Sequence, residues 1–270
     1  MHIPLPKTEQ AKLLSVSRQS LYYTKKKPTK DAQLQRLVRK VLAHHPAYGY
    51  RMVALELGLN KKCTQRIMQK YNLRPKIRAK QAVARPSRAE RLAGEAPNRL
   101  KLCCPIQPNA IWAGDFTKIW FRGHPRNLAT VIDLFTREII AWQIGNSHTN
   151  SLILAVLEEA KRRRRTTPMI FHTDQGSEYT SFSSAQWLLA HDILPSWSSK
   201  GKPWQNGIQE AFYRTFKLEF GSPNQHASLP ALQEAMGRYM RYYNTKRKHS
   251  ALKMAPRQFY NTKKWCSTSN

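Results

Sequence analysis

The alternation of apolar and polar residues predicts that the chain begins with helices. Residues 31–43 carry apolar side chains at helical spacing, so one face of this segment is continuously apolar: Leu34, Leu37, Val38, Val41 and Leu42. Residues 51–57 and 61–71 read as two further helices, with the turn sequence GLN at 58–60 between them. A cluster of short helices with a glycine turn is typical of helix-turn-helix proteins.

The third of these helices is basic, since it carries Lys61, Lys62, Arg66 and Lys70. We therefore expect residues 1–76 to form a helical region in which these four side chains contact DNA. The alternative is a three-helix packing module whose basic face is only solvated. From 77 to 108 no period is sustained and Pro, Gly, Ala and Arg recur, which predicts a basic linker.

The pattern changes after the linker to strands and then to alternating helices and strands. Residues 111–121, 127–135 and 138–145 are rich in β-branched and aromatic side chains, which favours an antiparallel meander. The following segments read as helix, strand, helix, strand and helix, at 149–165, 168–174, 180–191, 193–197 and 205–220. This order predicts an α/β fold over 109–225, a ribonuclease-H-like mixed five-stranded sheet with flanking helices. Residues 226–270 would add a C-terminal helix, from 226 to 244, and a basic tail.

The charge of the protein predicts a polyanionic binding partner. The formal net charge is +30 over 270 residues, but it is uneven. Residues 1–100 hold 23 basic and 5 acidic side chains, 101–220 hold 14 and 10, and 221–270 hold 9 and 1. A nearly balanced centre between basic flanks fits a core that gathers acids around cations, carried between segments that bind nucleic-acid phosphates.

Other compositional signals exclude several classes. The start of the chain lacks the apolar run of a secretory signal, and no stretch approaches the ~18 apolar residues that span a bilayer. We expect a cytoplasmic, nucleoid-associated protein without membrane contact. The cysteines Cys63, Cys103, Cys104 and Cys266 form no CxxC pair, which argues against a zinc site.

Three carboxylates carry the candidate chemistry. Asp115 interrupts an apolar, aromatic strand, where an acid is costly unless it is paired or bound to a cation. Asp174 ends the next buried strand, and Glu210 lies on a helix after the flexible stretch SSKGKPWQNG. If the two strands are neighbours, both aspartates lie at one sheet edge. Oxygen ligands without His or Cys suit two Mg²⁺ or Mn²⁺ ions, the arrangement that cuts phosphodiesters by in-line attack.

The helix of Glu210 would hold phosphate as well as metal, because Arg214 and Lys217 follow on the same face. Each residue also has a plainer interpretation, as an exposed ion-pair stripe, a cap or a salt bridge. Other acids compete for the role. We expect Asp133 to cap a strand end, Glu178 to lie behind the metal ligands, and Glu219 to face solvent.

Several stretches resemble the catalytic subunit of bacterial insertion-sequence transposases of the two-reading-frame type (OrfB-like), relatives of retroviral integrases. They are WAGDFTKIW, VIDLFTREIIAW, FHTDQGSEY, SSKGKPWQNGIQEAFYRTFKLE and YNTKRKHSALKMAP, over about 109–259. Upstream, LLSVSRQSLYY and HPAYGYRMVALEL resemble that family's N-terminal helical region. The resemblance implies a catalytic and metal-binding triad of Asp115, Asp174 and Glu210, and DNA contacts from Lys200, Asn206 and Lys217. It also matches flanking motif positions at His172, Tyr179 and Gly201.

The resemblance further implies a homo-oligomer that brings together two element ends, and a separate upstream frame that supplies a helix-turn-helix. This chain would then be the downstream part of the working enzyme. One departure is Gln205, where the family usually has Asp; we expect it to tune activity. The predicted function is metal-dependent DNA cleavage and strand transfer. Two alternatives remain open: a non-catalytic DNA-binding regulator of transposition, and a nuclease or resolvase on the same fold.

Overall fold

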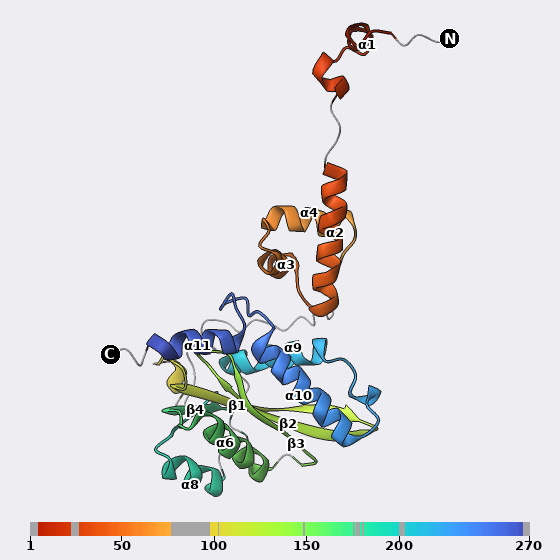
Figure 1. Cartoon of the computed structure of the whole chain (residues 1–270). Helices are drawn as coiled ribbons and strands as arrows, with labels where there is room; N and C mark the ends of the chain where they lie inside the picture. Colours follow the sequence, from red (N-terminus) through yellow and green to blue (C-terminus); the bar gives the residue numbers. More distant parts are fainter. Residues whose placement is uncertain are drawn as a thin grey trace. The chain divides into compact units, whose positions relative to one another are not determined.

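The computed structural model describes residues 5–22, 27–76, 98–101, 103–147, 149–174, 176, 179, 181–199 and 203–266. The chain divides into two compact units, shown with the sequence colours in Figure 1. The first contains residues 1–44 and 49–74, and the second contains 45–48 and 75–270. The short segment His45–Tyr48 thus belongs with the second unit although it lies between two helices of the first.

The first unit is helical. Its elements are α1 (Lys7–Leu13), the 3₁₀ turn η1 (Arg18–Tyr22), α2 (Lys27–His44), α3 (Tyr50–Leu57) and α4 (Lys61–Lys70). Gly58 ends α3 in the left-handed region, at φ 64°, and the Asn60 side chain caps α4 by accepting a hydrogen bond from Lys62 N. The three predicted helices are confirmed. Val38 is fully buried, but Leu37 is 45% exposed, so the apolar face of α2 is only partly covered.

A five-stranded sheet forms the second unit, in the order β3-β2-β1-β4-β5. The strands are β1 (Ile111–Phe121), β2 (His124–Asp133), β3 (Ile139–Gly145), β4 (Ile170–Thr173) and β5 (Leu194–Trp197). β1, β2 and β3 are antiparallel neighbours, whereas β4 is parallel to β1 and β5 is parallel to β4. The predicted meander and mixed sheet are confirmed, and this topology is ribonuclease-H-like.

The first hairpin is tighter than expected. Arg122 and Gly123 both have positive φ, 50° and 79°, so they form a two-residue turn that pairs Phe121 directly with His124. β2 therefore begins before the predicted residue 127. Pro125 is tolerated inside the strand because the β2–β3 pairing starts only at Asn127, further along β2.

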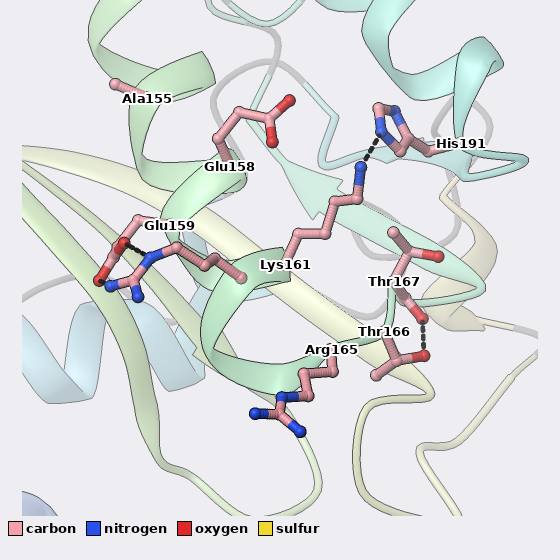
Figure 2. Close-up of a pocket in the computed structure, with 9 residues that line it drawn as sticks. Ala155, Glu158, Glu159, Lys161, Arg165, Thr166, Thr167 and His191 are labelled. Carbon is pink, nitrogen blue, oxygen red and sulfur yellow. Dashed lines mark hydrogen bonds and ion pairs between the residues drawn. The ribbon is translucent and has the colours of Figure 1, made fainter.

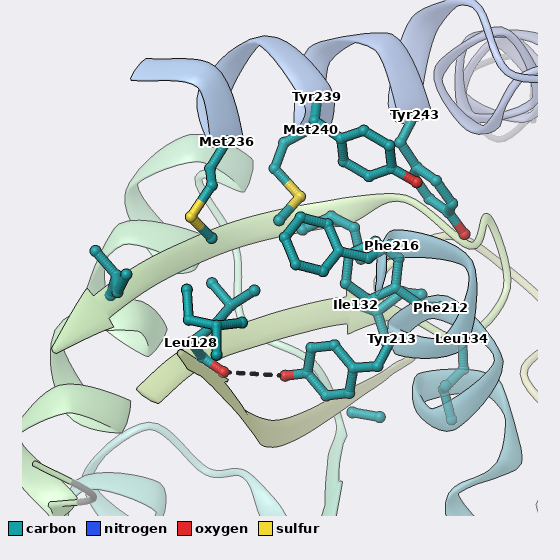
Figure 3. Close-up of a cluster of buried hydrophobic side chains, with 14 of the residues drawn as sticks. Leu128, Ile132, Leu134, Phe212, Tyr213, Phe216, Met236, Tyr239, Met240 and Tyr243 are labelled. Atoms are coloured by element: carbon teal, nitrogen blue, oxygen red, sulfur yellow. Dashed lines mark hydrogen bonds between the residues drawn. The ribbon is translucent and has the colours of Figure 1, made fainter. Parts of the chain in front are cut away.

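Helices cover both faces of the sheet (Figure 1). α6 (Asn150–Arg164) and α8 (Phe182–Ala190) pack on one face, around Trp112, Val131 and Phe171. α9 (Gly207–Glu219), which follows η3 (Pro203–Asn206), and α10 (Leu229–Thr245) cover the other. Figure 3 shows that aromatic and methionine side chains fill this second layer. The remaining short 3₁₀ turns are η2 (Arg99–Lys101) and η4 (Pro223–Gln225).

The C-terminal region holds a helix that the sequence prediction missed. Residues expected to form only a basic tail include α11 (Pro256–Cys266). Its Arg257 forms an ion pair with the buried Glu138, which also binds Arg164 at 2.6 Å, and the Arg164 guanidinium lies 4.1 Å from the Tyr260 ring centroid. These contacts with residues far away in the sequence hold α11 against the rest of the unit. No helix among the described residues is long and apolar enough to cross a membrane.

Candidate active site

Asp115 lies in the middle of β1, directly opposite the fully buried Thr130 of β2. Its side chain is partly buried, and its Oδ1 accepts a hydrogen bond from Phe116 N at 2.7 Å. Any larger residue before it would force a shift, because a Cβ on Gly114 would lie 2.4 Å from Cζ of Phe171. Close packing behind the strand therefore holds Asp115 in a fixed place.

Asp174 follows β4, the parallel neighbour of β1. The β1–β4 pairing ends at Ala113 and His172, and Asp115 and Asp174 each follow that last pair by two residues. Asp174 is exposed, and its Oδ1 accepts a hydrogen bond from Gly176 N at 3.0 Å. The predicted neighbourhood of these two strands is thus confirmed.

Glu210 lies in the first turn of α9. The buried face of α9 is formed by Gln209, Phe212, Tyr213 and Phe216, so Glu210 and Arg214 point outward, with Lys217 partly exposed. Although Glu210 reaches the surface, partial desolvation by the surrounding protein raises the pKa of its carboxyl, and the Arg214 charge opposes that rise. A nearby cation would stabilise the charged form of this partly desolvated carboxyl.

Buried polar groups support the strand ends behind these acids. His172 is fully buried, its Nδ1 lies 2.9 Å from Ser196 Oγ, and burial lowers the pKa of its imidazole to about 4 while the backbone of Gln205 acts in the opposite direction. Gln205 Oε1 accepts hydrogen bonds from Ser199 N at 2.6 Å and from Asn98 Nδ2 at 2.9 Å. Gln205 therefore fastens the segment before α9 to the end of the predicted linker.

The predicted linker, 77–108, lies mostly outside the described residues, but its end packs on the sheet. Arg99 N donates to Ser196 Oγ at 3.0 Å, and Arg99 Nε donates to Pro195 O at 3.0 Å. Residues 98–101 are therefore held beside β5. Lys200, Gly201 and the competing acid Glu178 lie outside the described residues.

Two competing acids can be assigned. Asp133 is fully buried at the end of β2 and accepts backbone hydrogen bonds from Asn109, Phe135 and Thr136, as expected for a cap. The prediction for Glu219 is wrong, because its side chain is only 3% exposed and is bound by Arg247 and Tyr239. The helix periodicity placed Glu219 outward, but α10 and its following turn cover that surface.

The metal-binding geometry is incomplete in the described part of the chain. No group of three or more His, Cys, Asp or Glu side chains there lies close enough to hold an ion. The donor chemistry nevertheless fits a hard divalent cation, since all three candidates offer carboxylate oxygens. The fold makes the strand of Asp115 the parallel neighbour of the strand that Asp174 follows, and it packs the helix of Glu210 against the β1–β2 pair that carries Asp115.

The predicted DNA contacts occupy different environments. Asn206 is buried, whereas Lys61 and Lys62 are exposed on α4. Arg66 and Lys70 both bind Asp31, at 2.7 Å each, and these hydrogen bonds hold the pKa of the Asp31 carboxyl well below its usual range. Asp31 was not predicted from the sequence, because its partners Arg66 and Lys70 lie 35 and 39 residues further along the chain.

A cavity of about 800 Å³ lies on the other face of the sheet, beside the end of α6 (Figure 2). Lys161 Nζ points across it to His191 Nε2, at 2.7 Å, and Glu159 and Arg165 also line it. None of the three predicted carboxylates contributes to its wall. The cavity therefore does not belong to the candidate site.

Comparison with known proteins defines the class. Two models of the integrase core domain match residues 105–203 and 191–256. The chain is 29% identical over 268 residues to transposase InsK of insertion sequence IS150 from Escherichia coli strain K12, covering 95% of this chain and 94% of that protein. It is 36% identical over 147 residues to the transposase of IS904 from Lactococcus lactis, covering 54% and 58%. Among solved structures, it is similar to the HTLV-2 integrase catalytic core in complex with magnesium, with a TM-score of 0.49, 17% identity, and 58% and 99% covered.

The ribonuclease-H-like sheet with an integrase core domain defines a polynucleotidyl transferase of the DDE type. The chain belongs to the insertion-sequence transposases of the retroviral-integrase-like superfamily, which confirms the resemblance seen in the sequence. Its activity is transposition of an insertion sequence, with DNA as the substrate, and the family uses a divalent metal ion.

Proposed function

We propose that Asp115, Asp174 and Glu210 are the catalytic triad and that together they hold two Mg²⁺ or Mn²⁺ ions. The observation that supports this proposal is the parallel β1–β4 pairing, because Asp115 and Asp174 each follow its last pair, Ala113 and His172, by two residues. α9 carries Glu210 in its first turn, and its neighbour Tyr213 bonds the Asp115 carbonyl. On this proposal, three carboxylates from three elements converge on one edge of the sheet.

When bound, the metal ions supply charge neutralisation at the scissile phosphate and favour the deprotonated form of the attacking oxygen. The residues of the chain supply the rest. The carboxylates fix the position of the cations, while Arg214 and Lys217, on the same face of α9 as Glu210, orient the phosphate backbone. Lys200 would contact the DNA end beside them. No covalent enzyme intermediate is required for in-line transfer to a 3′-hydroxyl.

We further propose that the working assembly is a homo-oligomer that brings two element ends together. An upstream-frame protein would supply a helix-turn-helix for end recognition. The basic flanks support this arrangement, because 23 basic residues against 5 acidic ones in 1–100 provide phosphate contacts away from the catalytic core.

The test is strand joining by Asp174→Asn, which keeps the shape of the side chain but removes its charge. With DNA that carries the inverted repeats flanking the coding region, we expect Mg²⁺-dependent cleavage and joining to fall at least ~10³-fold, an effect of ~4 kcal/mol on the barrier, while DNA binding is retained. Glu234→Gln is the matched control, because Glu234 is 72% exposed on α10 and pairs only with Arg238 among the described residues. Undiminished joining by Asp174→Asn would refute the triad.

The same assay separates the rival functions. A regulator of transposition would bind DNA without cleaving it, and a nuclease or resolvase would cleave without joining when a 3′-hydroxyl donor end is supplied. Joined product that depends on both the donor end and Mg²⁺ identifies strand transfer.

A further inference from the structure

Four polar groups form a hydrogen-bonded chain between α9 and the β1–β2 pair. Gln209 Nε2 donates to the Thr130 hydroxyl, with a second, longer contact to Thr130 O at 3.4 Å. The Thr130 and Tyr213 hydroxyl oxygens lie 2.8 Å apart, and the Tyr213 hydroxyl lies 2.5 Å from the Asp115 backbone carbonyl. Gln209, Thr130 and Tyr213 are all buried.

The direction of this chain is determined by its ends. The Asp115 carbonyl can only accept, so Tyr213 must donate its single hydroxyl hydrogen to it. Tyr213 then accepts from Thr130, and Thr130 accepts from the Gln209 amide. Each hydroxyl donates once and accepts once, and serial hydrogen bonds of this kind strengthen one another in a buried environment.

The hydrogen-bonded groups lie next to two of the candidate metal-binding residues, Glu210 and Asp115. Gln209 immediately precedes Glu210 on α9, and Tyr213 follows one helical turn later. Thr130 is the cross-strand partner of Asp115. The two elements that carry Asp115 and Glu210 are therefore held together at the level of these residues. Figure 3 shows the Tyr213 ring reaching from α9 toward the strands, where its hydroxyl also approaches Leu128 O at 3.4 Å.

We propose that Tyr213 is a positioning residue of the active site: through the Asp115 carbonyl, it fixes the separation between the Asp115 and Glu210 carboxylates that hold the metal ions. This inference rests on the proposed triad.

The primary measurement is the affinity of the full chain for Mn²⁺ alone, by titration calorimetry, with Mg²⁺-dependent strand joining as the second readout. Tyr213→Phe keeps the ring, whose centroid lies 5.4 Å from that of Phe212, and removes only the hydroxyl. We expect the Kd for Mn²⁺ to rise about tenfold, equal to ~1.4 kcal/mol. The Mg²⁺ concentration for half-maximal joining should rise in parallel.

Two variants of Thr130 test the hydrogen bond that the Thr130 hydroxyl donates to Tyr213. Thr130→Val keeps the shape but removes the hydroxyl, so it should weaken Mn²⁺ binding as Tyr213→Phe does. Thr130→Ser keeps the hydroxyl and should bind Mn²⁺ within about twofold of the original chain.

Tyr239→Phe is the matched control, because it also removes a buried hydroxyl from the same core. That hydroxyl donates to Glu219 at 2.9 Å, away from Asp115. We expect Tyr239→Phe to lower the melting temperature without changing the Kd for Mn²⁺. An unchanged Kd in Tyr213→Phe, or an equal rise in Tyr239→Phe, would overturn the positioning role.

Asp174→Asn, measured in the same titration, separates this proposal from the proposed function. If Asp174→Asn binds Mn²⁺ as the original chain does, the triad itself is wrong. If Asp174→Asn loses binding while Tyr213→Phe keeps it, only the positioning role fails.

Discussion

The guanidinium of Arg247 binds the carboxylate of Glu219 through Nε, at 2.9 and 3.0 Å, and the Tyr239 hydroxyl donates to the same carboxylate at 2.9 Å. Arg247 comes from the YNTKRKH stretch, two residues after the end of α10, and Glu219 ends α9. The side chain of Glu219 is 3% exposed and that of Arg247 is 16% exposed. Arg247 therefore holds α9, the helix of Glu210, in the core. Not every basic residue of this stretch is available to bind DNA.

Arg247→Ala should destabilise the chain strongly, because it leaves the buried Glu219 charge without its cationic partner. We expect a loss of about 3–5 kcal/mol in the free energy of unfolding, measured by urea denaturation. Arg238→Ala is the control, since Arg238 forms an exposed pair with Glu234 and should cost less than about 1 kcal/mol. Equal losses would show that Arg247 contributes no more than a surface pair.

Gly114 and Gly237 should respond to alanine in opposite directions. A Cβ on Gly114 would overlap the Phe171 ring, so Gly114→Ala should cost about 1–3 kcal/mol and reduce activity by displacing β1 beside Asp115. A Cβ on Gly237 in α10 meets Trp142 at an ordinary 3.6 Å, so Gly237→Ala should stabilise by up to about 1 kcal/mol. Thermal unfolding of both variants checks the pair, and a neutral Gly114→Ala would show that Phe171 can move aside.

His249 should make stability depend on pH. Burial, with repulsion from Arg137 and Arg247, lowers the pKa of its imidazole to about 4, compared with ~6.5 in an unfolded chain. Between these values only the unfolded chain binds the proton, so the stabilisation is complete above pH ~6.5 and is lost as pH falls toward 4. When the pH is lowered from ~7.5 to ~5, the free energy of unfolding of His249→Gln should fall by about 2 kcal/mol less than that of the original protein. His172 has a similar shift and stays in both proteins, so an identical pH slope would exclude His249 as a source.

The basic residues of α4 should differ in their contribution to DNA binding. Lys61 and Lys62 are exposed, whereas Arg66 and Lys70 are engaged by Asp31. Lys61→Ala and Lys62→Ala should each reduce the slope of log K against log salt by about 0.9, the value for one neutralised phosphate. Arg66→Ala should change it little. Fluorescence anisotropy over a range of salt concentrations measures these slopes, and an equal effect of Arg66→Ala would mean that Arg66 exchanges Asp31 for phosphate on binding.

Periodicity in the sequence was sufficient to predict most of the sheet and the helices that cover it. α6 and α10 show their apolar pattern locally, because each buries one face against the sheet. β1 begins as a continuous buried run, because helices cover both of its faces. The position of Asp115 in a strand and Asp174 at a strand end followed from the same pattern. The motifs then predicted the transposase family, which the comparisons confirmed.

Contacts between distant residues were not accessible to local pattern. α11 depends on Arg257 and Glu138, which are far apart in the chain, and Glu219 is covered by a residue of the turn after α10. The parallel pairing of Ala113 with His172 is another such contact. The length of the helix-containing segment that connects the strands does not specify which residues pair.

The sequence by itself determined most of the secondary structure, the candidate carboxylates and the family, because these depend on residue type and spacing along the chain. Only the tertiary structure decided which basic side chains form ion pairs with Asp31 or Glu219. It also decided that the Tyr213 hydroxyl donates a hydrogen bond to the Asp115 backbone carbonyl. The reason is physical: an ion pair or a buried hydrogen bond depends on the distance and burial of two groups, and these are set by packing of the whole fold.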